Sequence, residues 1–102
     1  MAAKREQDLE RKLRDRLKAA GCLPLKFESP GYTGVPDRLI LIPGGKIVFV
    51  EMKAPGKTER PRQVVVQRRF RDLGFVVFSS VDSEEKIDAV VEYCREAMSN
   101  GI

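Results

Sequence analysis

Apolar residues recur along this chain with two different spacings. Leu9, Leu13 and Leu17 are four residues apart, which is typical of one helix face, and Gly21 then favours an end to that helix. By contrast, residues 75–78 are continuously apolar, which predicts a short buried strand. The whole pattern predicts elements in this order: a helix over 6–20, strands over 23–28, 35–42 and 46–53, a helix over 61–73, a strand over 75–78, and a helix that begins near Ser80 or Ser83 and ends near Met98.

The sequence Pro-Gly-Gly at 43–45 lies between two predicted strands and is typical of a β-hairpin turn. If all three residues form the loop, the pairing places Asp37 directly opposite Glu51. A two-residue loop would instead place Met52 opposite Asp37, and a bulge near Asp37 would also change the register. The three-residue loop is our working prediction.

Directly opposed residues share one face of a sheet, so Asp37 and Glu51 would be close neighbours. Two like charges in this position destabilise a strand pair, and the rest of that face is apolar. A bound divalent cation would offset the repulsion. Lys53 projects from the same face two residues later, whereas the Met52 side chain points away and only its main-chain carbonyl could turn toward a metal.

Two further polar positions lie near the apolar faces of the predicted helices. Glu6 and Glu10 lie on or beside the apolar stripe of the first helix, so either could reach a site beside the sheet. The alternative for Glu10 is a solvated flank with a helix pair to Arg14. On the second helix, Gln63 follows the core-facing rim, where an amide more often bonds only to the backbone.

Composition narrows the possible chemistry. The 102 residues contain no His and two Cys, with 42% apolar and 33% charged residues. These values predict one globular domain over 1–102. The order of the predicted helices and strands adds an α/β fold, whose mixed sheet is flanked by helices. Without His, there is no Ser-His-Asp machinery, and neither a His-ligated nor a four-cysteine zinc site can form. Catalysis would therefore depend on Asp, Glu, Lys and Gln, with an oxygen-ligated ion.

The formal charge of +4 is unevenly placed. Residues 53–71 hold seven Lys and Arg and one acid, whereas 79–102 hold six acids and two bases. A basic run is often only a solvated face, but beside a carboxylate site it favours a polyanionic partner. We expect no membrane partner, because no apolar run approaches the length of a span and the first residues do not form a signal peptide.

The motifs together resemble those of one nuclease family. Gly34-Val35-Pro36-Asp37 is followed by Glu51-Met52-Lys53, then by Gln63 on a helix. This arrangement resembles the VRR-NUC (virus-type replication-repair nuclease) family of the PD-(D/E)XK superfamily. The likeness extends over about residues 6–90 and includes Lys26-Phe27, Ser29-Pro30-Gly31 and Lys53-Ala54-Pro55-Gly56.

The resemblance implies a role for each motif residue. Asp37 and Glu51 would bind Mg²⁺ or Mn²⁺, with the Met52 main-chain carbonyl as a third ligand. Lys53 would orient or deprotonate the attacking water and offset charge at the scissile phosphate. Gln63 would support the lysine or the phosphate.

Glu10 matches the family's N-terminal acid, which would hold a second ion or position its water, and Glu6 is the second choice. For DNA contact we expect four basic residues: Arg38, Lys57, Arg60 and Arg62.

The resemblance also implies a restriction-endonuclease-like core, in the order α-β-β-β-α-β-α. The implied activity is a metal-dependent, structure-selective DNA endonuclease acting on branched DNA such as Holliday junctions or flaps. Short family members suggest a homodimer in the cytoplasm of a bacterium or phage-infected cell, serving replication or repair. The alternatives are a non-catalytic nucleic-acid-binding module that uses the basic face, or acids with a purely structural role.

Overall fold

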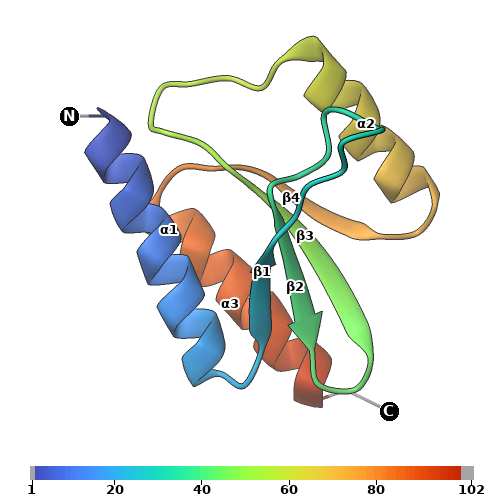
Figure 1. Cartoon of the computed structure of the whole chain (residues 1–102). Helices are drawn as coiled ribbons and strands as arrows, with labels where there is room; N and C mark the ends of the chain where they lie inside the picture. Colours follow the sequence, from blue (N-terminus) through green and yellow to red (C-terminus); the bar gives the residue numbers. More distant parts are fainter. Residues whose placement is uncertain (1, 100–102) are drawn as a thin grey trace.

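The computed structural model describes residues 2–99 and places three helices around one sheet (Figure 1). The element order is the one predicted from the sequence. The bounds are α1 Ala2–Ala19, β1 Leu23–Lys26, β2 Arg38–Ile42, β3 Lys46–Met52, α2 Pro61–Asp72, β4 Val76–Val81 and α3 Glu84–Ser99. Ser83 caps α3, since its Oγ accepts a hydrogen bond from the Lys86 N–H at 3.2 Å.

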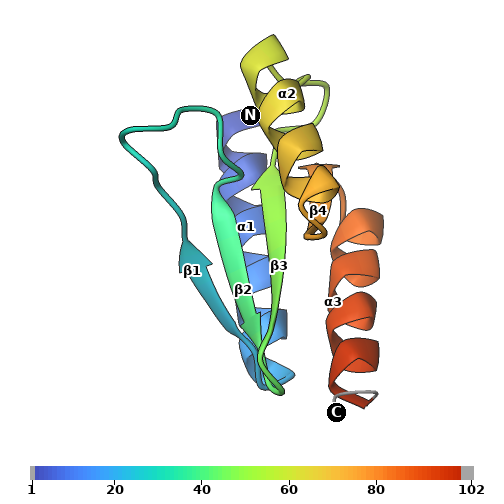
Figure 2. The ribbon, with the colours of Figure 1, turned by 90° about the vertical axis from the view of Figure 1, so that its right-hand side faces the viewer.

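The four strands form one sheet in the order β1-β2-β3-β4, which Figure 2 shows from the side. The first three strands are antiparallel, whereas β4 runs parallel to β3. Parallel neighbours need a crossover, and α2 supplies it between β3 and β4. The predicted mixed sheet is therefore confirmed.

The hairpin has the predicted register. Ile42 pairs with Lys46 and Arg38 with Val50, so residues 43–45 form a three-residue turn. Strand β2 begins at Arg38, not at residue 35 as predicted. The physical reason is Pro36, which has no N–H to give to a sheet ladder.

Most of the core lies on one face of the sheet. Alternate residues of β2 and β3, including Ile40, Val48 and Val50, are fully buried against α1 and α3. The two helices lie side by side over this face (Figure 1). Cys22 and Cys94 are buried here as free thiols.

The opposite face holds α2 through aromatic contacts. The Phe49 ring lies 4.8 Å from Phe70, 5.6 Å from Phe27 and 5.7 Å from Phe75, measured between ring centres. Such edge and tilted contacts add stability beyond the area that the rings bury. Because Phe49 is two residues before Glu51, this aromatic face is also the face on which the acids lie.

Gly34 sets how closely the β1–β2 loop approaches α2. Its φ is +91°, and an added Cβ would lie 2.8 Å from Cγ of Arg62 and 3.2 Å from the Arg62 carbonyl oxygen. We expect Gly34→Ala to lower the free energy of unfolding by about 1–3 kcal/mol, because it combines strain with a backbone clash. Urea denaturation measures this loss. Gly31→Ala is the matched control, since no atom lies within 4 Å of its added Cβ; equal stability of the two variants would contradict the account.

Candidate active site

The end of the β2–β3 hairpin brings two carboxylates together. Glu51 Oε1 accepts a hydrogen bond from the Asp37 N–H at 3.2 Å. Asp37 Oδ1 in turn accepts one from the Met52 N–H at 3.1 Å. Each acid therefore fixes the backbone beside the other, and the opposition expected from the turn length is present in the structure.

Lys53 and Gln63 complete a connected group with Glu51. The Gln63 Nε2 donates to Glu51 Oε2 at 3.0 Å, and Lys53 Nζ donates to Gln63 Oε1 at the same distance. Lys53 Nζ also lies 3.2 Å from Glu51 Oε2. Glu51 and Gln63 are only 4% and 7% exposed, so these contacts are shielded from water.

Gln63 also bonds to the backbone. Its Oε1, which accepts from Lys53, accepts a second hydrogen bond from the Arg60 N–H at 2.9 Å. This contact satisfies one of the free backbone donors at the start of α2. The Gln63 side chain thus caps the start of α2 and connects this helix to Glu51 on β3.

A contact that the sequence did not reveal holds the connection between β3 and α2. Glu59 accepts a hydrogen bond from the Ser80 N–H at 2.9 Å. Ser80 has a φ of +49° and lies where the pairing of β3 with β4 shifts register. No local pattern announces such a bulge, so Glu59 could not be assigned from sequence.

The two acids are difficult to ionise together. Burial raises the pKa of Asp37 to about 7, and the charges of Glu51 and Glu10 act in the same direction. Burial also raises the pKa of Glu51, although Lys53 opposes this shift. Perturbed carboxylates of this kind are typical of functional sites.

The donor set fits a hard cation. Asp37 and Glu51 offer carboxylate oxygens, which Mg²⁺ prefers, and a cation would relieve their repulsion. No group of three or more His, Cys, Asp or Glu suited to one metal is present within residues 2–99. An ion here would therefore depend on two carboxylates together with main-chain and water oxygens, as is common for Mg²⁺.

Glu10, on α1, is hydrogen-bonded to Arg38 and not to Asp37 or Glu51. Its carboxylate lies 3.5 Å from Arg38 Nη2, and not in the helix pair with Arg14 considered above. Glu10 is close enough for its charge to raise the pKa of Asp37. Glu6 is half-buried one turn earlier in the helix.

The expected basic residues fall into two groups. Lys57, Arg60 and Arg62 are exposed, and the last two line a cleft of about 330 Å³. Arg38 differs, because its side chain is only 19% exposed and pairs with Glu10. The structure thus places Lys57, Arg60 and Arg62 where a polyanion could reach them.

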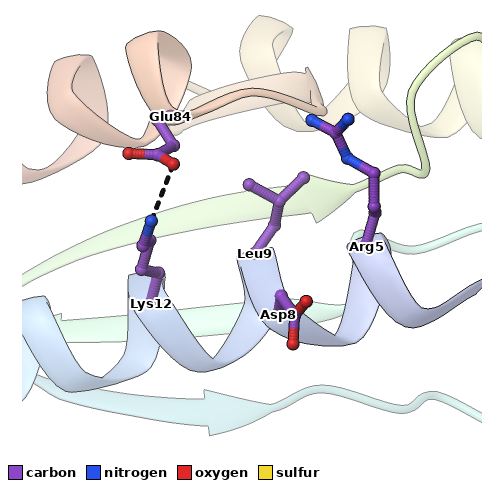
Figure 3. A pocket seen from close by; sticks show the side chains of 5 residues that line it. All are labelled: Arg5, Asp8, Leu9, Lys12 and Glu84. Atoms are coloured by element: carbon purple, nitrogen blue, oxygen red, sulfur yellow. Dashed lines mark hydrogen bonds and ion pairs between the residues drawn. The ribbon is translucent and has the colours of Figure 1, made fainter. Parts of the chain in front are cut away.

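A second hollow, between α1 and α3, lacks these features (Figure 3). It measures about 250 Å³ and includes Lys12, whose Nζ donates to Glu84 Oε2 at 2.7 Å. This exposed ion pair joins two helices and has none of the predicted site residues around it. The end of the hairpin is therefore the better candidate for catalysis.

Comparison with known proteins identifies the family, although no family model matches the sequence. A solved structure described as a VRR_NUC domain superposes with a TM-score of 0.78, at 32% identity over 87% of this chain and 96% of that one. The chain belongs to the VRR-NUC family. A curated relative named "Putative nuclease p44", from Acyrthosiphon pisum secondary endosymbiont phage 1, is 42% identical over 88 residues, or 84% of this chain and 95% of the relative.

Family membership confirms the restriction-endonuclease-like fold of this VRR-NUC protein. Within the described part of the chain, no helix is long and apolar enough to cross a membrane.

The raised pKa of Asp37 makes the stability of this VRR-NUC protein depend on pH when metal is chelated. Between its ordinary pKa of 3.8 and about 7, Asp37 is protonated when folded and ionised when unfolded. The free energy of unfolding should therefore fall as pH rises through this window and level off above it. We expect Asp37→Asn to reduce this slope, and to be more stable than wild type at pH 8 by on the order of 1–2 kcal/mol, in urea titrations with EDTA.

The control is Asp72→Asn, at an exposed position at the end of α2. This variant should keep the wild-type slope. An Asp37→Asn slope as steep as that of wild type would contradict the assignment.

Proposed function

We propose that this VRR-NUC protein is a metal-dependent, structure-selective endonuclease that hydrolyses phosphodiester bonds in branched DNA, such as Holliday junctions or flaps. The observation that carries the proposal is the opposed pair Asp37 and Glu51, with Lys53 hydrogen-bonded beside it through Gln63. A metal-assisted hydrolase needs oxygen ligands, a placed water and positive charge at the phosphate. This group supplies carboxylate ligands and a lysine charge without histidine, and Lys53 would place the water.

Asp37, Glu51 and the Met52 main-chain carbonyl would hold Mg²⁺ or Mn²⁺. When bound, the ion would polarise the phosphate and make a bound water more acidic. Lys53 would orient the attacking water and place positive charge near the phosphate as negative charge develops. Gln63 keeps the lysine in position, since its Oε1 accepts from Nζ at 3.0 Å.

Glu10 would contribute from the first helix, by holding a second ion or positioning its water. The observation in support is electrostatic: its charge reaches Asp37 strongly enough to help raise the pKa of that acid. Arg38 lies against Glu10 and would balance part of this negative charge, besides meeting the DNA backbone.

DNA is the substrate that the surrounding charge favours. Lys57, Arg60 and Arg62 are exposed around the start of α2. Basic side chains that neutralise phosphates supply most of the sequence-independent affinity of proteins for DNA. The phage source of one relative supports action in replication or repair, in the cytoplasm of a bacterium or a phage-infected cell.

A non-catalytic nucleic-acid-binding module is the second candidate, and the exposed basic residues favour it equally. It would bind DNA in a salt-dependent manner without turnover. The buried carboxylates weigh against it, because paired acids repel phosphate and serve no purpose in a surface that only binds.

Cleavage of a DNA panel tests the catalytic assignment. Flap, splayed-arm, four-way and linear substrates are incubated with Mg²⁺ or Mn²⁺. We expect cleavage of branched forms by wild type, and a loss of about 100-fold or more in Asp37→Asn and Lys53→Ala, because each removes a group acting on the phosphate or the metal.

Lys12→Ala is the matched control, since it removes a lysine of an exposed ion pair away from the hairpin end. It should cut like wild type. Binding without any metal-dependent cleavage by wild type would instead favour the second candidate.

We also propose that two copies act together, each cutting one strand of a junction. Exposed apolar side chains support this proposal and lie on α2 and the turn after it: Val64, Val65, Leu73 and Phe75. Large apolar side chains that are exposed to water favour contact with a second protein chain.

Sedimentation tests this assembly. Wild type should sediment as a dimer at micromolar concentration, and Val65→Glu should shift it to a monomer, because a charge would be buried at the interface. Leu23→Glu, on an exposed residue at the other edge of the sheet, should leave the dimer intact. A monomeric wild type would overturn the proposal.

A further inference from the structure

A cleft at the start of α2 shares Gln63 with the candidate active site, and its other lining residues are outside the group of Asp37, Glu51 and Lys53. It has a volume of about 330 Å³ and is lined by residues of the β1–β2 loop and of the start of α2: Thr33, Gly34, Arg60, Arg62 and Gln63. Its volume is at the small end of the range for ligand sites. Because Gln63 also contacts Glu51 and Lys53, the cleft adjoins the candidate active site directly.

An exposed aromatic ring lies at the rim of this cleft. Tyr32 precedes the lining residue Thr33 and is 41% exposed. The Arg62 guanidinium carbon lies 4.9 Å from the centre of the Tyr32 ring, which is cation–π distance. Arg62 Nε also donates to the Thr33 carbonyl at 3.1 Å.

Further contacts hold the loop that carries Tyr32. The Tyr32 N–H donates to the Ser29 carbonyl at 3.0 Å and closes a turn. Gly34 then lets the loop approach the α2 backbone more closely than a side chain would allow. A partly exposed aromatic ring beside arginines is an arrangement that proteins use to stack nucleic-acid bases.

We propose that the cleft binds one unpaired nucleotide next to the scissile phosphate, with its base stacked on the Tyr32–Arg62 pair. Arg60 meets the phosphate of this nucleotide, while Arg62 holds the ring. The inference rests on the proposed nuclease function and deepens it. Bases in a continuous duplex are already paired and stacked, whereas flaps and splayed arms carry unpaired bases that are free to stack on protein. The Tyr32–Arg62 pair therefore contributes to the selection of branched DNA.

A test combines protein and substrate changes. The cleavage position on a flap substrate is first mapped with the wild-type protein. Each nucleotide next to that position is then replaced in turn by an abasic residue. We expect Tyr32→Ala to lower kcat/KM about ten-fold on the intact flap, in line with the loss of one base–aromatic contact. At one flanking position, the abasic residue should lower kcat/KM of wild type by a similar factor. The same abasic residue should not lower kcat/KM of Tyr32→Ala any further, because both changes remove the same contact.

Tyr32→Phe is the matched variant, because it keeps the ring and loses only the hydroxyl. It should cut the intact flap within about two-fold of wild type, since stacking depends on the ring face. A urea midpoint checks that Tyr32→Ala still folds, which its exposure favours. Equal losses for Tyr32→Ala on intact and abasic DNA at every flanking position, or no loss on intact DNA, would overturn the inference.

A binding measurement separates this inference from the nuclease proposal. A single-stranded oligonucleotide carrying 2-aminopurine is added in EDTA, where stacking on protein changes the fluorescence of that base. A change with wild type and Tyr32→Phe, lost in Tyr32→Ala, supports the cleft even if no DNA is cut. Cleavage by wild type without any Tyr32-dependent change in fluorescence overturns the cleft and leaves the nuclease proposal standing.

Discussion

The opposition of Asp37 and Glu51 at the end of one hairpin is the constraint around which the site is built. A three-residue turn sets the register, and the two-residue period of the strands places both side chains on one face. Glu51 then accepts a hydrogen bond from the Asp37 N–H, and Asp37 accepts one from the Met52 N–H, so the two strand ends are tied together. Without a cation, ionising both acids costs free energy, because burial first, and then the charge of Glu51, raises the pKa of Asp37. A folded protein keeps such a cost where function needs it.

Lys53 and Gln63 offset part of the free-energy cost of burying the Glu51 charge. Lys53 brings a positive charge to Glu51, and Gln63 bridges the two side chains through its amide. Because the Gln63 side chain also caps the start of α2, the position of the helix and the geometry of the acids depend on the same side chain. A change that moves α2 would therefore move the lysine relative to Glu51. The loop between β3 and α2 is held separately, by the hydrogen bond from the Ser80 N–H to Glu59.

One face of the sheet carries the main core, and the other carries the candidate active site. One face packs against α1 and α3 and supplies most of the buried apolar surface. The other carries the acids and an aromatic cluster around Phe49, which fixes α2 over the strand end. The polar network therefore lies at the end of the sheet, where DNA can approach, and the main core is not interrupted by charge. In a chain of 102 residues this separation keeps a polar site from weakening the single core.

The sequence by itself determined the order of the elements, the register of the hairpin and the opposition of Asp37 to Glu51. These features follow from local rules, because turn length and side-chain period act over a few neighbouring residues. Only the tertiary structure decided that Gln63 reaches Glu51, that Glu10 meets Arg38 instead of Arg14, and that Tyr32 lies under Arg62. Those contacts depend on where α1, α2 and the β1–β2 loop pack against the sheet. That packing results from many distant contacts acting together, which no single stretch of sequence specifies.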